Sequence, residues 1–258
     1  MDDDSEGGTG LPASLEAAWG LRARPSKGPK RGLSLEQIVE AAVKIATSDG
    51  LEAVSMGRVA GDLGVSTMSL YRYVAAKDEL LALMVDATAA SPPAAPAPGE
   101  GWRAGLSRLA RAELDIYRRH PWVLRVPISG PPVAPNQIAW LEQGLRCLRD
   151  TGLAEGEKLS VMLLLTAFVR SWGRLEADLM EASMASGASA QAAMSGYGRL
   201  LARLTDAERF PALHAVIAAG VFDDGPDDPD EPDEFVFGLE RVLDGIGALV
   251  RARAGPRP

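Results

Sequence analysis

The sequence contains very little of the chemistry on which disulfides, metal centres and most enzymes depend. Its 258 residues include one cysteine and two histidines. The single cysteine, Cys147, excludes an internal disulfide and a cysteine-cluster metal site, and we expect it to be a small apolar residue on a helix. The serine-nucleophile, phosphate-loop and zinc-helix motifs are also missing. We therefore expect no catalytic activity, no metal and no cofactor.

Long hydrophobic runs are absent too. No segment approaches the roughly 20 apolar residues that a membrane-spanning helix needs, and the N-terminus, MDDDSEGGTG, is too acidic and polar for a secretory signal. The sequence thus predicts a cytoplasmic protein without a membrane partner. A hydrophobic content of 47% over 258 residues is enough to build a sizeable core.

The net charge of −8 is distributed unevenly along the chain. The segment DDGPDDPDEPDE (Asp223–Glu234) holds eight acidic residues, whereas RARPSKGPKR (Arg22–Arg31) holds five basic residues and no acid. A net acidic protein still binds nucleic acid if its positive charge is concentrated where the phosphates lie. The acidic segment is best interpreted as a solvated linker, because its prolines and irregular spacing do not resemble a calcium loop.

The hydrophobic pattern predicts an all-α protein, because apolar residues recur at helical spacing and no stretch alternates like a strand. Prolines in SPPAAPAPG (91–99) mark a boundary between two parts. We expect a flexible arm over 1–32, a small helical domain over 33–90 and a larger helical domain over 100–258. The expected helices are 35–48, 56–63, 67–74, 77–89, 102–120, 137–150, 155–185, 199–204, 206–219 and 234–252, with a further short turn near 15–19. Asn136 is expected to cap the helix 137–150, and Asp206 the helix that runs to 219.

Residues 34–74 fit a helix-turn-helix unit. Ser34 and Gln37 have the spacing of a capping box, and Ser55 and Ser66 are placed to cap the next two helices. Gly64 suits the tight turn between those helices. The apolar positions that would face the first helix are Val59, Leu63, Val65, Leu70 and Val74.

Once those positions are assigned to the core, the third helix exposes hydroxyls, a thioether and an arginine. Such groups bond phosphates and base edges or contact thymine methyl groups. A plain helical corner would show the same turn pattern, but the basic arm and the downstream Lys77 favour DNA. The candidate DNA-binding residues are Ser55, Arg58, Ser66, Thr67, Met68, Ser69, Tyr71, Arg72, Tyr73 and Lys77.

The stretch LGVSTMSLYRYVAAKDELL within residues 38–86 resembles the tetracycline-repressor (TetR) family of bacterial regulators. The arm AAWGLRARPSKGPKRG is similar to that of an actinobacterial subgroup. The resemblance implies a homodimer on a palindromic operator, with base or groove contacts from Thr67, Met68 and Tyr71. It also implies phosphate contacts from Ser55, Ser69, Tyr73 and Lys77, while Arg72 could make either kind. Gly57 departs from the arginine that many members carry, and Arg58 beside it could reach a phosphate instead.

The role of the basic arm stays open between two interpretations. Arginine-bearing arms lie along the minor groove in homeodomains, which favours a groove contact here. A disordered basic tail would instead add only nonspecific attraction.

The larger domain carries aromatic side chains at helical spacing. Such residues are more often core than pocket, but as a group they suit an apolar cavity for a small effector. The candidate pocket residues are Trp102, Tyr117, Trp122, Trp140, Phe168 and Trp172.

The family resemblance places the dimer surface on the helices near 155–185 and 234–252. One helical row holds Leu159, Leu163, Thr166, Arg170 and Gly173, and another holds Phe235, Leu239, Val242, Ile246, Leu249 and Val250. The resulting hypothesis is a ligand-responsive DNA-binding regulator, in which an effector moves helix 77–89 and releases the operator. The alternative is a helical protein-interaction module without sequence-specific DNA binding. Effector, operator, regulated genes and the choice between repressor and activator do not follow from the sequence.

Overall fold

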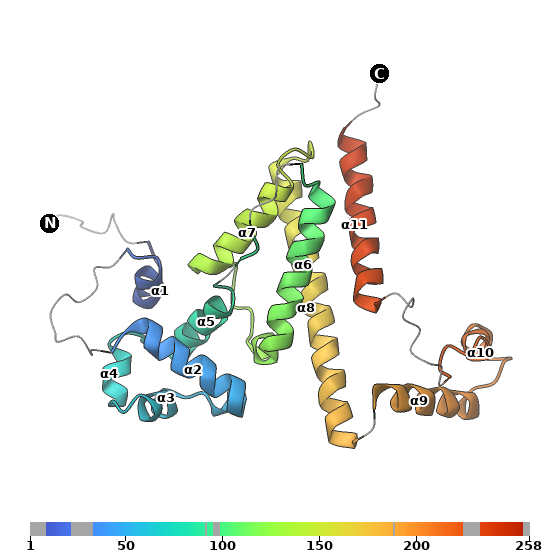
Figure 1. The fold of residues 1–258 in the computed structure, drawn as a ribbon, viewed down its shortest axis with the longest axis horizontal. Helices are drawn as coiled ribbons and strands as arrows, with labels where there is room; N and C mark the ends of the chain where they lie inside the picture. The colour runs from blue at the N-terminus through green and yellow to red at the C-terminus, as the bar shows by residue number, and fades with distance from the viewer. Residues whose placement is uncertain are drawn as a thin grey trace. The chain divides into compact units, whose positions relative to one another are not determined.

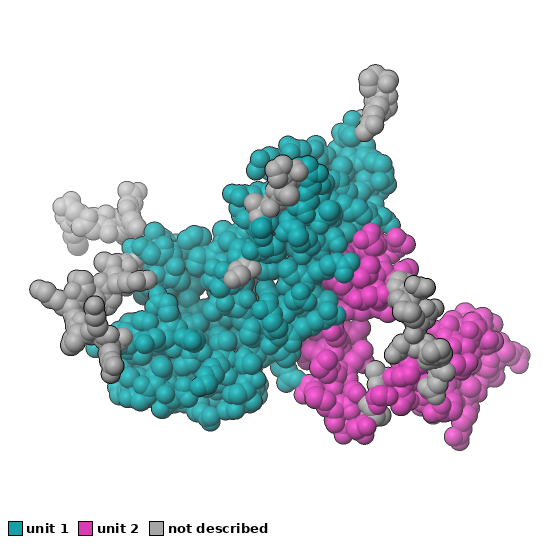
Figure 2. All heavy atoms as spheres, in the orientation of Figure 1, with its two compact units in different colours: residues 1–170, 242–258 teal, residues 171–241 magenta. Residues whose placement is uncertain are grey.

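The computed structural model describes residues 9–21, 33–90, 92–94, 99–187, 189–223 and 233–254. All regular elements within these ranges are helical, which confirms the predicted all-α class (Figure 1). Two compact units are present, residues 1–170 with 242–258 and residues 171–241 (Figure 2). The basic segment 22–31 and most of the acidic segment lie outside the described residues. The two units divide the chain after residue 170 and after residue 241, so they do not test the predicted domain boundary at 91–99. That boundary stays a prediction.

The helical elements of residues 33–90, called the DNA-binding part below, are α2 (Leu35–Asp49), η1 (Leu51–Ala53), α3 (Met56–Asp62), α4 (Thr67–Tyr71) and α5 (Lys77–Thr88). Helices α2, α3 and α4 begin directly after the predicted caps Ser34, Ser55 and Ser66, whereas α5 begins without a side-chain cap. The capping box is complete, because the Ser34 hydroxyl accepts from the Gln37 N–H at 3.2 Å and the Gln37 side chain accepts from the Ser34 N–H at 2.9 Å. Helix α2 ends at Gly50, whose φ of 87° is open only to a residue without a side chain.

Helix α4 is shorter than predicted and ends at Tyr71. The backbone N–H groups of Tyr73 and Val74 both bond to the Leu70 carbonyl, at 2.8 and 3.0 Å, so the helix closes in a tight turn there. Val59, Leu70 and Val74 are fully buried, as their spacing predicts. The core of the unit thus fixes α4 and determines which of its side chains face outward.

A short helix, α1 (Ala13–Ala18), forms where the sequence indicated only a turn. Its Leu15 side chain is 5% exposed and its Ser14 side chain is 1% exposed, so the helix is packed rather than free. Helix α1 packs against α5 of the DNA-binding part.

The rest of the first unit is built from α6 (Trp102–Arg119), η2 (Pro121–Arg125), α7 (Pro135–Cys147), the start of α8 (Glu155–Ser186) and the end of α11 (Glu234–Arg253). Helices α6 and α7 pack closely and antiparallel, because Gly105 lies against Cys147 and Gly144 lies against Leu109. A methyl group at Gly144 would also collide with Met162 of α8. These contacts hold the three helices together around an apolar core.

The second unit corrects two predictions. The expected loop 186–198 is largely the helix α9 (Ala190–Leu204), whose N-cap Ser189 accepts from the Ala192 N–H at 3.1 Å. Asp206 does not cap a helix: it accepts from the Arg209 N–H at 2.8 Å in a turn, and α10 (Pro211–Ala218) begins afterwards. Within the described part of the chain, no helix is both long and apolar enough to cross a membrane.

Candidate DNA interface and effector site

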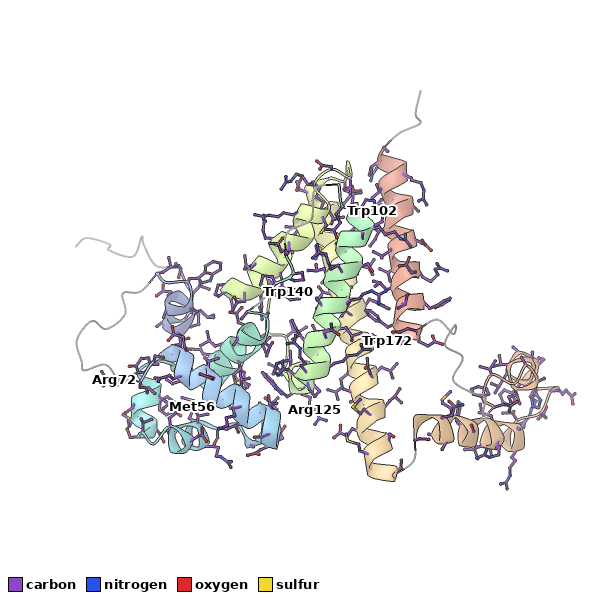
Figure 3. The ribbon with its side chains drawn as sticks, in the orientation of Figure 1. Met56, Arg72, Trp102, Arg125, Trp140 and Trp172 are labelled. Carbon is purple, nitrogen blue, oxygen red and sulfur yellow. The ribbon has the colours of Figure 1, made fainter. Side chains whose placement is uncertain are left out.

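Helix α4 exposes the side chains that the sequence assigned to DNA. Met68 is 75% exposed and Tyr71 is 47% exposed, although both are large and partly apolar. Arg72, the C-cap residue of α4, is exposed on its outer side (Figure 3). No acidic residue lies within α4 or at its two caps, so nothing in the helix repels a phosphate.

The serines at the helix starts use their hydroxyls as caps. Ser55 accepts from the Arg58 N–H at 3.2 Å, and Ser66 accepts from the Ser69 N–H at 3.3 Å. The Ser66 and Ser69 hydroxyls are 2.9 Å apart and bonded to each other. Both caps are exposed, which leaves their hydroxyls within reach of a backbone phosphate.

Two other candidate DNA contacts have partners inside the chain. The Tyr73 hydroxyl donates to the Leu33 carbonyl at 2.7 Å, which joins the segment before α2 to the turn after α4, the recognition helix. The Arg58 guanidinium pairs with the Asp49 carboxylate at 2.8 Å, and both side chains are exposed. An exposed ion pair contributes little stability, so a phosphate can compete for Arg58. Both DNA contacts stay predictions.

Two of the predicted pocket tryptophans connect the helices that follow residue 100, called the effector part below, to the DNA-binding part. The Trp122 indole N–H donates to the Thr47 hydroxyl of α2 at 3.3 Å. The Trp140 indole N–H donates to the Ala89 carbonyl, at the end of α5, at 2.9 Å. Each ring is thereby held at the contact between the two parts, and its role in an effector pocket stays a prediction.

Three further predicted pocket aromatics lie on α6 and α8, and their role in an effector pocket stays a prediction. Trp102 lies against Gly247 of α11. Trp172 packs against Phe235 with ring centroids 6.1 Å apart, and Phe168 is half-buried on α8. Trp102, Trp140 and Trp172 can be followed on their separate helices in Figure 3.

A polar cluster within the helical core escaped the sequence analysis. The Tyr117 hydroxyl donates to the Glu113 carboxyl at 2.8 Å, one turn away on α6. Burial raises the pKa of Glu113 to about 7, against the lowering effects of the Tyr117 hydrogen bond and the Arg170 charge. Burial and the Glu113 charge also raise the pKa of Tyr117. The i, i+4 spacing of an acid and a tyrosine on α6 is the only sequence signal for this pair.

Arg170 belongs to the same neighbourhood, although the sequence placed it in the dimer row. Its guanidinium donates to the carbonyls of Leu124 and Val126, at 3.3 and 3.0 Å, at the end of η2. Phe235, Leu239 and Ile246 of the second row are likewise buried within the protomer. These four side chains therefore serve the protomer's own packing.

The end of α5 is tied to the start of α7 by a buried carboxylate. Asp86 is 4% exposed and accepts from the Gln137 N–H at 3.0 Å and from the Asn136 side chain at 2.9 Å. Burial raises the pKa of Asp86, and the three hydrogen bonds from Gln137 and Asn136 oppose that rise. Asn136 was predicted to cap this helix itself. Instead its side chain is turned to Asp86, and Asp86 supplies the capping oxygen from another helix.

This arrangement defines a helix-turn-helix DNA-binding unit in which α5 is hydrogen-bonded directly to a larger helical domain. The chain matches the family model described as bacterial regulatory proteins, tetR family, over residues 38–84. It matches the model of the tetracyclin repressor-like C-terminal domain over residues 95–250.

Relatives from Streptomyces support the same assignment. The chain is 39% identical over 254 residues to the HTH-type transcriptional repressor DrrR1 of Streptomyces coeruleorubidus, covering 98% of this chain and 91% of the relative. Apo ActR of Streptomyces coelicolor aligns with a TM-score of 0.67 at 27% identity, over 88% of this chain and 99% of that one. ActR in complex with actinorhodin aligns with a TM-score of 0.67 at 27% identity, over 86% and 97%.

The chain belongs to the TetR family. It is a ligand-responsive transcriptional repressor that binds operator DNA as a homodimer, and it is not an enzyme. The alternative of an interaction module without DNA binding is thereby set aside.

Proposed function

We propose that the protein reads a palindromic operator with the exposed face of α4. The observation that carries this proposal is the exposure of Met68, Tyr71 and Arg72 on a short helix whose opposite face is buried through Leu70. A thioether and a phenol ring contact thymine methyl groups and sugars, whereas Arg72 bonds a guanine edge or a phosphate. Thr67 and Ser69 add hydroxyls at the helix start.

The flanking residues position α4 on the duplex. Ser55, Arg58, Ser66, Tyr73 and Lys77 carry hydroxyls or positive charge beside it, and most are exposed. Contacts to phosphates fix orientation without reading sequence, so these residues set affinity more than specificity. A cytoplasmic location is part of this proposal, because the operator lies on the chromosome.

The dimer forms through α8 and α11 in this proposal. Helix α8 exposes a row of large apolar side chains, which is unusual for a surface without a partner. They are Leu159, Leu163, Leu164, Leu175, Leu179, Met180 and Met184, with exposed fractions from 50% to 73%. On α11, Phe237 is 54% exposed. A second copy of the chain covers these side chains.

The effector binds among α6, α7 and α8, next to Glu113 and Tyr117. ActR has been solved with actinorhodin and with (S)-DNPA, which supports a small organic effector here. The surroundings are mostly apolar, and the Glu113 carboxyl and Tyr117 hydroxyl supply the few polar groups that orient a ligand in such a site. With a pKa of about 7, Glu113 is present in both protonation states near neutral pH, so it can accept or donate a hydrogen bond.

Binding is transmitted through α5. Its last turn is bonded to α7 through Asp86 and Ala89, so a displacement of α7 moves α5 and with it the recognition unit. If the distance between the two α4 helices of the dimer changes, they can no longer bind both half-sites of the operator at once. Loss of simultaneous engagement lowers affinity by more than the loss of any single contact.

The test is the reciprocity of the two binding events. We would titrate a labelled operator duplex, obtained by selection from random DNA, with and without actinorhodin and a panel of related small organic molecules. A compound that binds should weaken operator affinity by some factor, and the operator should weaken binding of that compound by the same factor. Compounds that bind and leave operator affinity unchanged would contradict the switching mechanism while leaving DNA reading intact.

A further inference from the structure

A second connection between the effector part and the recognition unit runs through α1, outside the helices of the switch described above. The Ser14 hydroxyl of α1 donates to the Glu79 carboxylate, in the first turn of α5, at 2.6 Å. The same carboxylate oxygen accepts from the Ala75 N–H at 3.3 Å, just after the recognition helix. One end of α1 therefore holds the turn from which the recognition helix leads into α5.

The other end of α1 is attached to the effector part. The Trp19 indole N–H donates to the Val133 carbonyl at 2.8 Å, two residues before α7 begins. Ser14 itself is 1% exposed, and Leu15, between the two attachments, is 5% exposed. Packing and hydrogen bonds therefore hold α1 in place.

The two attachments of α1 connect α5 and the segment leading into α7 at places other than the direct contact between α5 and α7. The Asp86 and Trp140 bonds fix the C-terminal end of α5 to α7. Helix α1 joins the N-terminal end of α5 to the segment before α7. A helix held at one end pivots about that end, whereas a helix held at both ends moves only with its neighbours.

From these contacts we propose that α1 is an intramolecular strap that couples the recognition unit to the effector part, with Ser14 and Trp19 as its positioning residues. The strap limits the orientations that α4 samples in free protein. Operator binding then loses less conformational freedom, because part of the ordering is already present. The inference rests on DNA reading by α4 and adds a route that the α5–α7 bonds do not supply.

The test uses the full-length dimer carrying Ser14→Ala and Trp19→Phe together. The first change removes the hydroxyl and the second removes the indole N–H but keeps an aromatic ring. The matched control is Thr9→Ala, because Thr9 bonds to Glu16 at 2.8 Å within the same segment and reaches neither part. The probe is the operator duplex selected with the wild-type chain.

The double variant should bind the operator about three- to tenfold more weakly than wild type and the control, because only part of the stabilisation from the two lost hydrogen bonds is expressed as operator affinity. In wild type, operator binding should also slow hydrogen exchange of the amides of residues 131–138. That effect should weaken in the double variant while protection of residues 66–74 persists, because the Asp86, Trp122 and Trp140 bonds still join the two parts. A strap that only stabilised the fold would lower the melting temperature and leave operator affinity unchanged below it.

An unchanged or tightened operator affinity in the folded double variant would overturn the strap. So would exchange at residues 131–138 that responds to the operator as in wild type. A wild-type chain without affinity for any duplex would instead overturn DNA reading by α4, and the strap's role with it. The two failures are therefore distinguishable.

Discussion

The carboxylate of Asp86, in the last turn of α5, accepts the backbone N–H of Gln137 in the first turn of α7 at 3.0 Å. This bond makes a side chain of the DNA-binding part the cap of a helix in the effector part. Unpaired N–H groups at a helix start favour a negative charge there. The same contact therefore stabilises α7 and fixes α5, which joins stability to signal transmission.

Asp86→Ala should lower the free energy of unfolding by about 2 kcal/mol, because it removes the cap of α7 and the carboxylate that accepts from the half-buried Gln137 N–H and Asn136 side chain. Denaturant unfolding of the folded dimer measures this. The exposed acid Asp150 gives a matched control, Asp150→Ala, with a change within about 0.5 kcal/mol. Equal losses in the two variants would show that the cap is not formed.

Tyr71→Ala and Arg72→Ala should each weaken specific operator binding by about ten- to a hundredfold, since a good base contact contributes about 1–3 kcal/mol. The dimer and the melting temperature should be unchanged, because both side chains are exposed. Fluorescence anisotropy with specific and scrambled duplexes makes the measurement. Arg149→Ala removes an exposed arginine beyond α7 and serves as the control. Full operator affinity in either α4 variant would mean that α4 does not read the bases.

Leu163→Glu should convert the dimer to a monomer. Leu163 is 73% exposed on α8, and a carboxylate there would have to be buried against the second copy. Light scattering measures the mass, and operator affinity should fall together with it because one recognition helix alone remains engaged. Ile128→Glu is the control, since Ile128 is 72% exposed but lies outside α8 and α11. A Leu163→Glu chain that stays dimeric would place the interface elsewhere.

Glu113→Gln should change how stability depends on pH. The pKa of Glu113 is about 7 in the folded chain, against an ordinary pKa of 4.5 for a glutamate side chain. The raised value means that the stability contributed by its protonated form is complete below about pH 4.5 and is lost as pH rises through about 7. Glutamine keeps the acceptor for Tyr117 and carries no charge. Between pH 5 and pH 8, the free energy of unfolding of the variant should therefore rise by about 2 kcal/mol relative to that of wild type.

Unfolding free energies at a series of pH values test this expectation. The exposed Glu142 pairs with Arg146 on the surface of α7, and Glu142→Gln should leave the pH dependence parallel to that of wild type. A Glu113→Gln curve that also runs parallel would show that the Glu113 carboxyl titrates normally and is not a polar group held within the core.

The sequence predicted local features well, because their causes lie within a few residues. The Ser34–Gln37 capping box and the Ser55 and Ser66 caps all form as their spacing indicates. The buried face of α4 also follows from spacing alone. Helix α9 was missed because glycines and serines around its alanines suggested a loop, whereas alanine has the strongest helix preference of all residues.

Features made by distant residues could not be read from the chain. Asp86 caps a helix that starts some fifty residues later, and the spacing of Asn136 before α7 suggested the wrong cap. Trp122 and Trp140 were assigned to a pocket from their type, but their indole N–H groups bond to α2 and to the end of α5. Type and periodicity report that a side chain is buried. They do not report which partner it meets.

The most direct test is selection of bound sequences from a random DNA library at near-physiological salt, using the full-length dimer. DNA reading by two recognition helices predicts a palindromic consensus whose half-sites lie about one helical turn apart, or a multiple of it. The Tyr71→Ala chain should fail to enrich that consensus. A library that yields no consensus with the wild-type chain would contradict the account.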